Sequence, residues 1–235
     1  FLFFLLFEYF SIKMKLDATL DEIQHSRFHN LYHEFIQKTA KHSPFSETEL
    51  ACILIVYYKY VLVNGKRAKY MSRMQFFSFF DVIFDIYDVS IMERILITLA
   101  RESREITPQA WIKVFTIFMK SSLEEKIKFC FAVYDTEETG LLSRELISRY
   151  ANKCIVGEDD EAEGIAADLT DLLIRRMDVD RDGVISFNDY ATSVRATPSL
   201  LEFLGKCMPD RIGLIRAAHC CNIFSVLQAF GLEPK

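Results

Sequence analysis

The chain has 235 residues, 51% of them hydrophobic, so it is long and apolar enough to bury a sizeable core and is not disordered. Its 28 basic and 33 acidic residues give a formal net charge of -5, which argues against nucleic acid and against anionic membranes as partners. Its six cysteines have no CxxC or zinc-finger spacing, and we expect them to be buried and reduced.

Residues 1–13 begin with the apolar run FLFFLLFEYF, which is shorter than the about 20 residues of a membrane-spanning helix. No basic segment precedes this run, as it would in a signal peptide. We expect residues 1–13 to be an upstream extension, because the first methionine is Met14. A short hydrophobic tether is the alternative. Lys15 follows Met14, so no N-myristoylation signal begins there.

Residues 14–43 are predicted to form an amino-terminal helix, because their apolar side chains recur at helical spacing. The next stretch, HSPFSETEL, contains a break and then a capping box that starts another helix. Beyond it, apolar segments alternate with polar stretches at intervals of roughly 35 to 45 residues. This pattern indicates a repeated helix-loop-helix unit.

Two upstream polar stretches fit the frame of an ion-binding loop poorly. Residues 63–77 are degenerate, although Met71 occupies the position of a loop strand. Residues 99–110 fit through Ile106 and the following Trp111. Their ligand and glycine positions hold Leu99, Arg101, Arg104 and Ala110. We expect an ion-free amino-terminal lobe, with the phenylalanines of residues 76–84 in its core.

The third stretch, residues 135–146, keeps the frame with Gly140 at the bend and Leu142 at the strand position. Its candidate ligands are Asp135, Glu137 and Thr139. Leu146 occupies the twelfth position, which leaves the cage without its last carboxylate. Its expected role is structural, with Leu142 pairing to the strand of the next loop.

The fourth stretch, DVDRDGVISFND at residues 178–189, has the spacing of a complete twelve-residue calcium loop. Such a loop takes oxygen ligands from positions 1, 3, 5, 7, 9 and 12, with glycine at position 6. The predicted metal ligands are Asp178, Asp180, Asp182, Val184 through its carbonyl, Ser186 and Asp189. Gly183 makes the turn, and Ile185 is expected to pair with Leu142.

The twelfth ligand is aspartate, which is one methylene shorter than the usual glutamate. Bidentate coordination by Asp189 is therefore harder, and the coordination number falls from about seven toward six. We predict weaker calcium binding than a glutamate would give, with Mg²⁺ competing for the same site.

Two segments outside the loops complete the chain. The acidic run VGEDDEAEG, residues 156–164, is interpreted as a solvated turn between helices, and an added cation site or a partner-contact patch is the alternative. After residue 205, Pro209 and Gly213 interrupt the pattern, and IFSVLQAF is predicted to form a final helix.

We therefore predict an all-α, calmodulin-like EF-hand protein with two lobes, each of two paired EF-hands joined by short β-bridges. The predicted segments are an extension (1–13), a helix (14–43), an amino-terminal lobe (44–122), a carboxy-terminal EF-hand pair (123–205) and a divergent tail (206–235).

Residues 121–210 resemble the calaxin family, EF-hand proteins of motile cilia and flagella. The likeness rests on SLEEKIKFCFAVYD, the acidic insert before the last EF-hand, Asp189 in the twelfth loop position, and LLEFLGKCMPD. The resemblance implies a protein of the cytoplasm and the ciliary or flagellar axoneme. It implies binding to outer-arm dynein and its docking complex on doublet microtubules, and adjustment of the beat by calcium.

The chain departs from this family in its upstream loops, which generally stay acidic in calaxins. Arg101, Arg104, Ala110 and Leu146 interrupt them here. We expect a chain that keeps the docking role and loses much of the calcium response, as a divergent, sperm-specific paralogue would.

The predicted function is regulation of motility by a calcium-binding adaptor of outer-arm dynein. No GxSxG, P-loop or kinase signature occurs, so we do not expect an enzyme. One alternative is a soluble EF-hand sensor or regulatory subunit that acts on a phosphatase or kinase by exposing an apolar groove when calcium binds. A third interpretation is structural, with Mg²⁺ constantly bound in loop 178–189.

Overall fold

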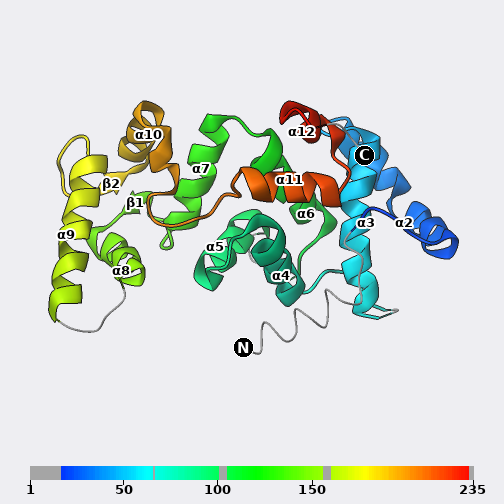
Figure 1. Cartoon of the computed structure of the whole chain (residues 1–235), viewed down its shortest axis with the longest axis horizontal. Coiled ribbons are helices and arrows are strands. Elements are labelled where there is room, and N and C mark those ends of the chain that lie inside the picture. The colour runs from blue at the N-terminus through cyan, green and yellow to red at the C-terminus, as the bar shows by residue number, and fades with distance from the viewer. Residues whose placement is uncertain (1–16, 66, 101–104, 156–159, 233–235) are drawn as a thin grey trace. The chain divides into compact units, whose positions relative to one another are not determined.

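The computed structural model describes residues 17–65, 67–100, 105–155 and 160–232, and these are predominantly helical (Figure 1). The all-α EF-hand fold predicted from the sequence is confirmed, because strands in these ranges are limited to one short pair and one isolated bridge. None of the helices described is long and apolar enough to cross a membrane. The predictions for residues 1–13 lie outside the described residues.

The described chain forms two compact units that alternate along the sequence. The first unit contains residues 17–87, 99–120 and 209–232, and the second contains residues 88–98 and 121–208. The predicted lobes, 44–122 and 123–205, were each continuous. The structure differs because residues 88–98 pack with the second unit and the tail packs with the first.

The first unit is built from helices of the amino-terminal half and from the tail. Its elements are α2 (Glu22–Ala40), α3 (Glu47–Val63), α4 (Arg73–Phe84), α6 (Pro108–Phe115), the π-helical turn η1 (Thr116–Lys120), α11 (Arg211–Cys220) and α12 (Phe224–Ala229). The second unit combines one upstream helix, apart from its last two residues, with the carboxy-terminal EF-hand pair. Its elements are α5 (Val89–Ala100), α7 (Leu123–Tyr134), β1 (Leu141–Leu142), α8 (Arg144–Cys154), α9 (Asp160–Met177), β2 (Ile185–Ser186), α10 (Phe187–Ala196) and the 3₁₀ helix η2 (Pro198–Glu202).

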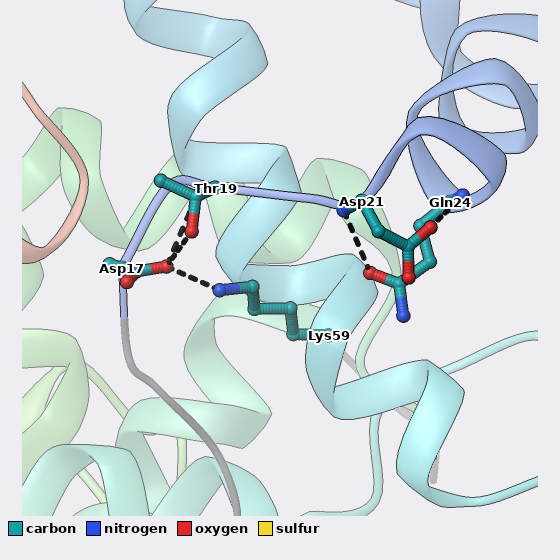
Figure 2. Close-up of polar contacts among 5 residues, drawn as sticks. All are labelled: Asp17, Thr19, Asp21, Gln24 and Lys59. Atoms are coloured by element: carbon teal, nitrogen blue, oxygen red, sulfur yellow. Dashed lines mark hydrogen bonds and ion pairs between the residues drawn. The ribbon is translucent and has the colours of Figure 1, made fainter.

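Asp17 attaches the segment before α2 to α3 (Figure 2). Its Oδ1 accepts hydrogen bonds from Thr19 N at 3.1 Å, from the Thr19 hydroxyl at 2.6 Å and from Lys59 Nζ. Burial alone would raise the pKa of Asp17, but the hydrogen bonds from Lys59 and Thr19 outweigh it and lower the pKa. Asp21 then begins α2, since its Oδ1 accepts from Gln24 N at 2.7 Å in a capping box.

Aromatic side chains fill the core of the first unit. Trp111 is fully buried, and its ring centroid lies 4.7 Å from that of Phe79 and 5.2 Å from that of Phe115. Trp111 Nε1 donates to the carbonyl of Ile53 on α3 at 3.0 Å, which satisfies its polar atom. The prediction that the phenylalanines of residues 76–84 form core is confirmed. Phe76, Phe77, Phe79, Phe80 and Phe84 are all buried.

In the second unit, β1 and β2 join the two EF-hand loops as an antiparallel pair. Leu142 pairs with Ile185, as predicted, and Leu141 pairs with Ser186. The side chains of Leu142 and Ile185 are both fully buried. The pairing therefore holds loops 135–146 and 178–189 side by side.

Candidate metal site

The loop between α9 and α10 is curved by hydrogen bonds from its backbone to its own aspartates. Asp178 Oδ1 accepts from Arg181 N at 2.7 Å, and its Oδ2 accepts from Gly183 N at 2.9 Å. Asp180 Oδ1 accepts from Asp182 N at 3.2 Å. Gly183 has a φ of 91°, which side chains disfavour, so glycine at the sixth position supplies the turn.

This curvature brings three carboxylates together. Ligand atoms of Asp178, Asp180 and Asp182 lie within 4.8 Å of one another. Across the described ranges, no other group of three or more His, Cys, Asp or Glu side chains meets that criterion. The donors are hard oxygen atoms, which suit Ca²⁺ or Mg²⁺ better than soft transition metals.

The crowded carboxylates repel one another. Desolvation, together with the charges of Asp182, Asp189 and Asp178, raises the pKa of Asp180 above its ordinary value. The ionised cluster is therefore unfavourable on its own. A bound cation would relieve this repulsion, so the residues present fit a divalent ion.

Asp189, at the twelfth position, is only 2% exposed and forms a capping box with Ser186 at the start of α10. Its Oδ2 accepts hydrogen bonds from Ser186 N at 3.0 Å and from the Ser186 hydroxyl. Its Oδ1 makes no hydrogen bond with the described residues. One carboxylate oxygen thus remains for a cation, which is the arrangement expected of a short twelfth ligand.

The predicted ligands therefore lie along one loop. Three aspartates stand at its start, Val184 precedes β2, and Ser186 and Asp189 stand at its end. Val184 N donates to Asp182 Oδ1 at 2.9 Å, which fixes the middle of the loop. The ligand set, and competition by Mg²⁺, remain predictions.

The partner loop, residues 135–146, has a related backbone without the twelfth carboxylate. Asp135 Oδ1 accepts from Thr139 N at 3.1 Å, and its Oδ2 accepts from Gly140 N at 2.7 Å. Leu146 is 3% exposed and packs as a core residue. Hydrogen bonds and apolar packing therefore hold this loop, which agrees with its expected structural role.

Arg94 of α5 supports this partner loop, and the sequence reasoning missed it. Its Nη2 donates to the carbonyl of Asp135 at 2.8 Å. That carbonyl lies at the carboxyl end of α7, where a cation is favourable. A single arginine within the apolar helix MERILITLA was the available signal, but nothing in the spacing identified its partner.

The two loops of the first unit meet through Met71 and Ile106, which form an isolated bridge, as their spacing predicts. The buried hydroxyl of Tyr57 donates to Ile106 O at 2.8 Å and accepts from Met71 N at 3.4 Å. This phenol joins the two loops from α3, so side-chain contacts fix their pairing. Arg101 and Arg104, which interrupt the second loop in the sequence, lie outside the described residues.

Comparison with known proteins extends the likeness well beyond one loop. Residues 124–195 match the family described as an EF-hand domain pair. Calaxin of Homo sapiens is 32% identical over 183 residues, which cover 74% of this chain and 84% of the human protein. Calaxin of Bos taurus is 31% identical over 182 residues, with the same coverage of 74% and 84%. A calcineurin subunit of Candida glabrata is 31% identical over 100 residues, which cover 42% of this chain and 55% of that protein.

Proposed function

The chain belongs to the calaxin family of EF-hand proteins, and from this premise we propose that it is a calcium-binding adaptor of axonemal outer-arm dynein. The observation that carries the proposal is the similarity to calaxins over 74% of the chain, because it extends far beyond the EF-hand pair. The proposed role is non-enzymatic regulation of ciliary or flagellar motility. The proposed partners are outer-arm dynein, its docking complex and doublet microtubules.

The EF-hand pair makes this a calcium-binding protein, and we assign the ion to loop 178–189. The carboxylates of Asp178, Asp180, Asp182 and Asp189 would hold it, with the carbonyl of Val184 and with Ser186, directly or through water. The ion supplies positive charge where the carboxylates crowd. Mg²⁺ competes at this site, because Asp189 has one oxygen free of its capping box.

Loop 178–189 is the one loop with a complete set of predicted ligands, so ion binding and docking would use different parts of the chain. Leu146 replaces the last ligand of the neighbouring loop, and the bridge between Met71 and Ile106 is fixed by Tyr57. Contacts between protein atoms therefore hold both pairs of loops together. We propose that the helices bind the axoneme at any calcium level, and that calcium acts through loop 178–189 alone.

A second candidate is a sensor or regulatory subunit that acts on a phosphatase or kinase away from the axoneme. The partial similarity to the calcineurin subunit, over 42% of this chain, favours it. This candidate requires calcium to expose apolar surface for a target. Binding of an apolar dye should then rise on calcium addition, whereas an adaptor docked through its helices needs no such rise.

The test is retention of the tagged full chain on isolated, detergent-stripped axonemes, washed in calcium or in chelator. Asp180→Ala removes the third loop position of the acidic loop, and Glu137→Ala is its matched control at the third position of loop 135–146. We expect wild type and Glu137→Ala to be retained in both washes. Loss of every protein in every wash would overturn the axonemal proposal and favour the sensor.

The same washes determine what the ion does. If Asp180→Ala is retained like wild type, the ion in loop 178–189 does not control docking, and calcium acts on the bound protein. If retention requires both calcium and Asp180, the loop is a docking switch, and the proposed independence of docking from calcium is wrong.

A further inference from the structure

The tail folds back onto the first unit, where α11 lies against α4 (Figure 1). Gly213 is the point of close approach. A Cβ added there would lie 3.1 Å from the carbonyl oxygen of Phe84 and 3.2 Å from that of Ile83. Glycine therefore favours this close approach, because a Cβ would fit only if the backbone of α4 shifted by a few tenths of an ångström.

One face of α11 is made of small residues. Ala217 follows Gly213 by one helical turn and is fully buried, as is the neighbouring Ala218. The exposed residues of α11 are Arg211, Ile212, Arg216 and His219, so the outer face is mostly polar but includes one apolar side chain. The inner face buries small side chains in a close helix crossing.

Glu49 of α3 makes the polar contact that holds α12. Its Oε1 accepts hydrogen bonds from Ser225 N at 3.2 Å and from the Ser225 hydroxyl. Its Oε2 accepts from Ser46 N at 3.0 Å in the capping box of α3. Since α12 has no side-chain cap of its own, Glu49 supplies one from another helix.

Charge strengthens this contact. Glu49 is 8% exposed, and burial alone would raise its pKa, but the hydrogen bonds from Ser225 and Ser46 lower it overall. Lys120 Nζ donates to the Ser225 hydroxyl at 2.7 Å, so a cation lies on the far side of that hydroxyl. The arrangement is a buried anion and a cation joined through one serine.

The two tail helices depend on this contact for their structure. They contain 10 and 6 residues, and helices shorter than about 12 to 15 residues are marginal in isolation. Gly213 lowers the intrinsic stability of α11 further, because glycine is a poorer helix former than alanine. The tail is thus helical because it is docked, as an amphipathic peptide is when it binds a groove.

We propose that α11 and α12 are an internal ligand that covers a helix-binding surface on α3 and α4 of the first unit. A helix of a partner protein can replace the tail on this surface. Such a helix has small residues one turn apart, and a serine or threonine beyond them whose hydroxyl reaches Glu49. Docking of such a helix releases the tail. The exchange does not depend on where the protein acts in the cell.

Two buried thiols of the tail report its release. Cys221 is fully buried and Cys220 is 8% exposed, whereas Cys130 and Cys207 are buried in the second unit. N-ethylmaleimide labelling of the reduced full chain, followed by peptide mass spectrometry, measures each thiol separately. Release exposes the tail pair alone, and global unfolding exposes all four.

The first variant is Glu49→Gln, because glutamine at this position keeps the capping box of α3 and loses the charge that holds Ser225. We expect labelling of Cys220 and Cys221 to accelerate roughly tenfold or more. Glu125→Gln is the matched control, since Glu125 forms the same capping box with Ser122 on α7. It should leave labelling of the tail unchanged.

The second variant is Gly213→Ala, for which helix propensity and docking predict opposite results. Alanine favours the helix itself, so a tail without close docking would be protected further. The clash with α4 should instead expose Cys220 and Cys221. Gly164→Ala in α9 is the control, because an added Cβ there meets no atom within 4 Å.

Exchange is tested by adding a fluorescent peptide of residues 209–232 to each full-length protein and measuring anisotropy. We expect the peptide, which keeps Gly213, to bind Gly213→Ala more tightly than wild type, whose surface is already covered, and Glu49→Gln to gain nothing because the peptide needs Glu49 for its own Ser225. Failure of the peptide to bind Gly213→Ala after the tail thiols of that variant become accessible would overturn the proposal. Protection of those thiols in both variants, or exposure of all four thiols together, would also overturn it, since the tail would then be a fixed part of the fold.

Discussion

Replacing Asp189 by glutamate should convert the acidic loop into a tighter and more selective calcium site. In the structure, Asp189 Oδ2 is engaged by Ser186, which leaves one oxygen for a cation. Glutamate adds a methylene and can present both oxygens to the ion. One further oxygen ligand should tighten the calcium Kd roughly tenfold, or about 1.4 kcal/mol. Mg²⁺ requires compact octahedral coordination, so its Kd should change less than about threefold.

The same substitution has a cost in the metal-free protein. Asp189 is 2% exposed, so the extra methylene overpacks its surroundings by about 1 to 3 kcal/mol. We therefore expect a lower Tm than wild type in chelator and a larger rise in Tm with calcium. A Tm that is lower in chelator but rises more with calcium indicates a change in coordination, whereas a general loss of stability would lower the Tm in both conditions.

Isothermal titration with calcium and with magnesium, each in separate experiments on wild type and Asp189→Glu, measures this effect directly. Asp189→Asn is the control, because it keeps the size of the side chain and removes its charge, and it should weaken both ions. An unchanged calcium Kd in Asp189→Glu, or equal gains for the two ions, would show that the length of the twelfth ligand does not set selectivity here.

Three further predictions concern the loops. Leu146→Glu should lower stability in chelator by about 2 to 5 kcal/mol because a buried leucine becomes a carboxylate, and calorimetry should detect partial recovery with calcium only if loop 135–146 can hold an ion. Asp180→Asn should raise the Tm of the metal-free protein and weaken calcium binding. The raised pKa of Asp180 means that its ionised form destabilises the fold, so this Tm gain should disappear as pH falls below the carboxyl range. Tyr57→Phe leaves the buried carbonyl of Ile106 without its donor, and urea titration should show a loss of about 1 to 3 kcal/mol with an unchanged slope.

The acidic loop and the strand pairings could be predicted from the sequence because their information is local. A glycine at the sixth position and apolar residues at the eighth specify the turn and the bridge. The pairing of Leu142 with Ile185 and the bridge between Met71 and Ile106 both follow from that spacing alone. The same spacing predicts the bridge even in loops that lack ligand residues, because packing preserves the backbone of the helix-loop-helix unit.

The prediction of a solvated turn at residues 156–164 is wrong in part. Helix α9 begins at Asp160, so the second half of the acidic run is helical. Residues 156–159 lie outside the described residues. Acidic side chains are favoured in the first turn of a helix by the macrodipole, and a cluster of them is therefore as typical of a helix start as of a turn.

The tail shows most clearly what local patterns cannot supply. The sequence pattern predicts an interruption at Gly213 and a helix only at IFSVLQAF, where α12 is found. Helix α11 nevertheless runs through Gly213, and the missing Cβ relieves a tight approach to Phe84, about 130 residues earlier in the chain. In an isolated segment, a glycine that weakens a helix and a glycine that permits a helix crossing look the same. The two roles differ only in whether another backbone lies opposite the glycine. The contact between α11 and α4 can therefore be recognised only when the positions of both helices are known.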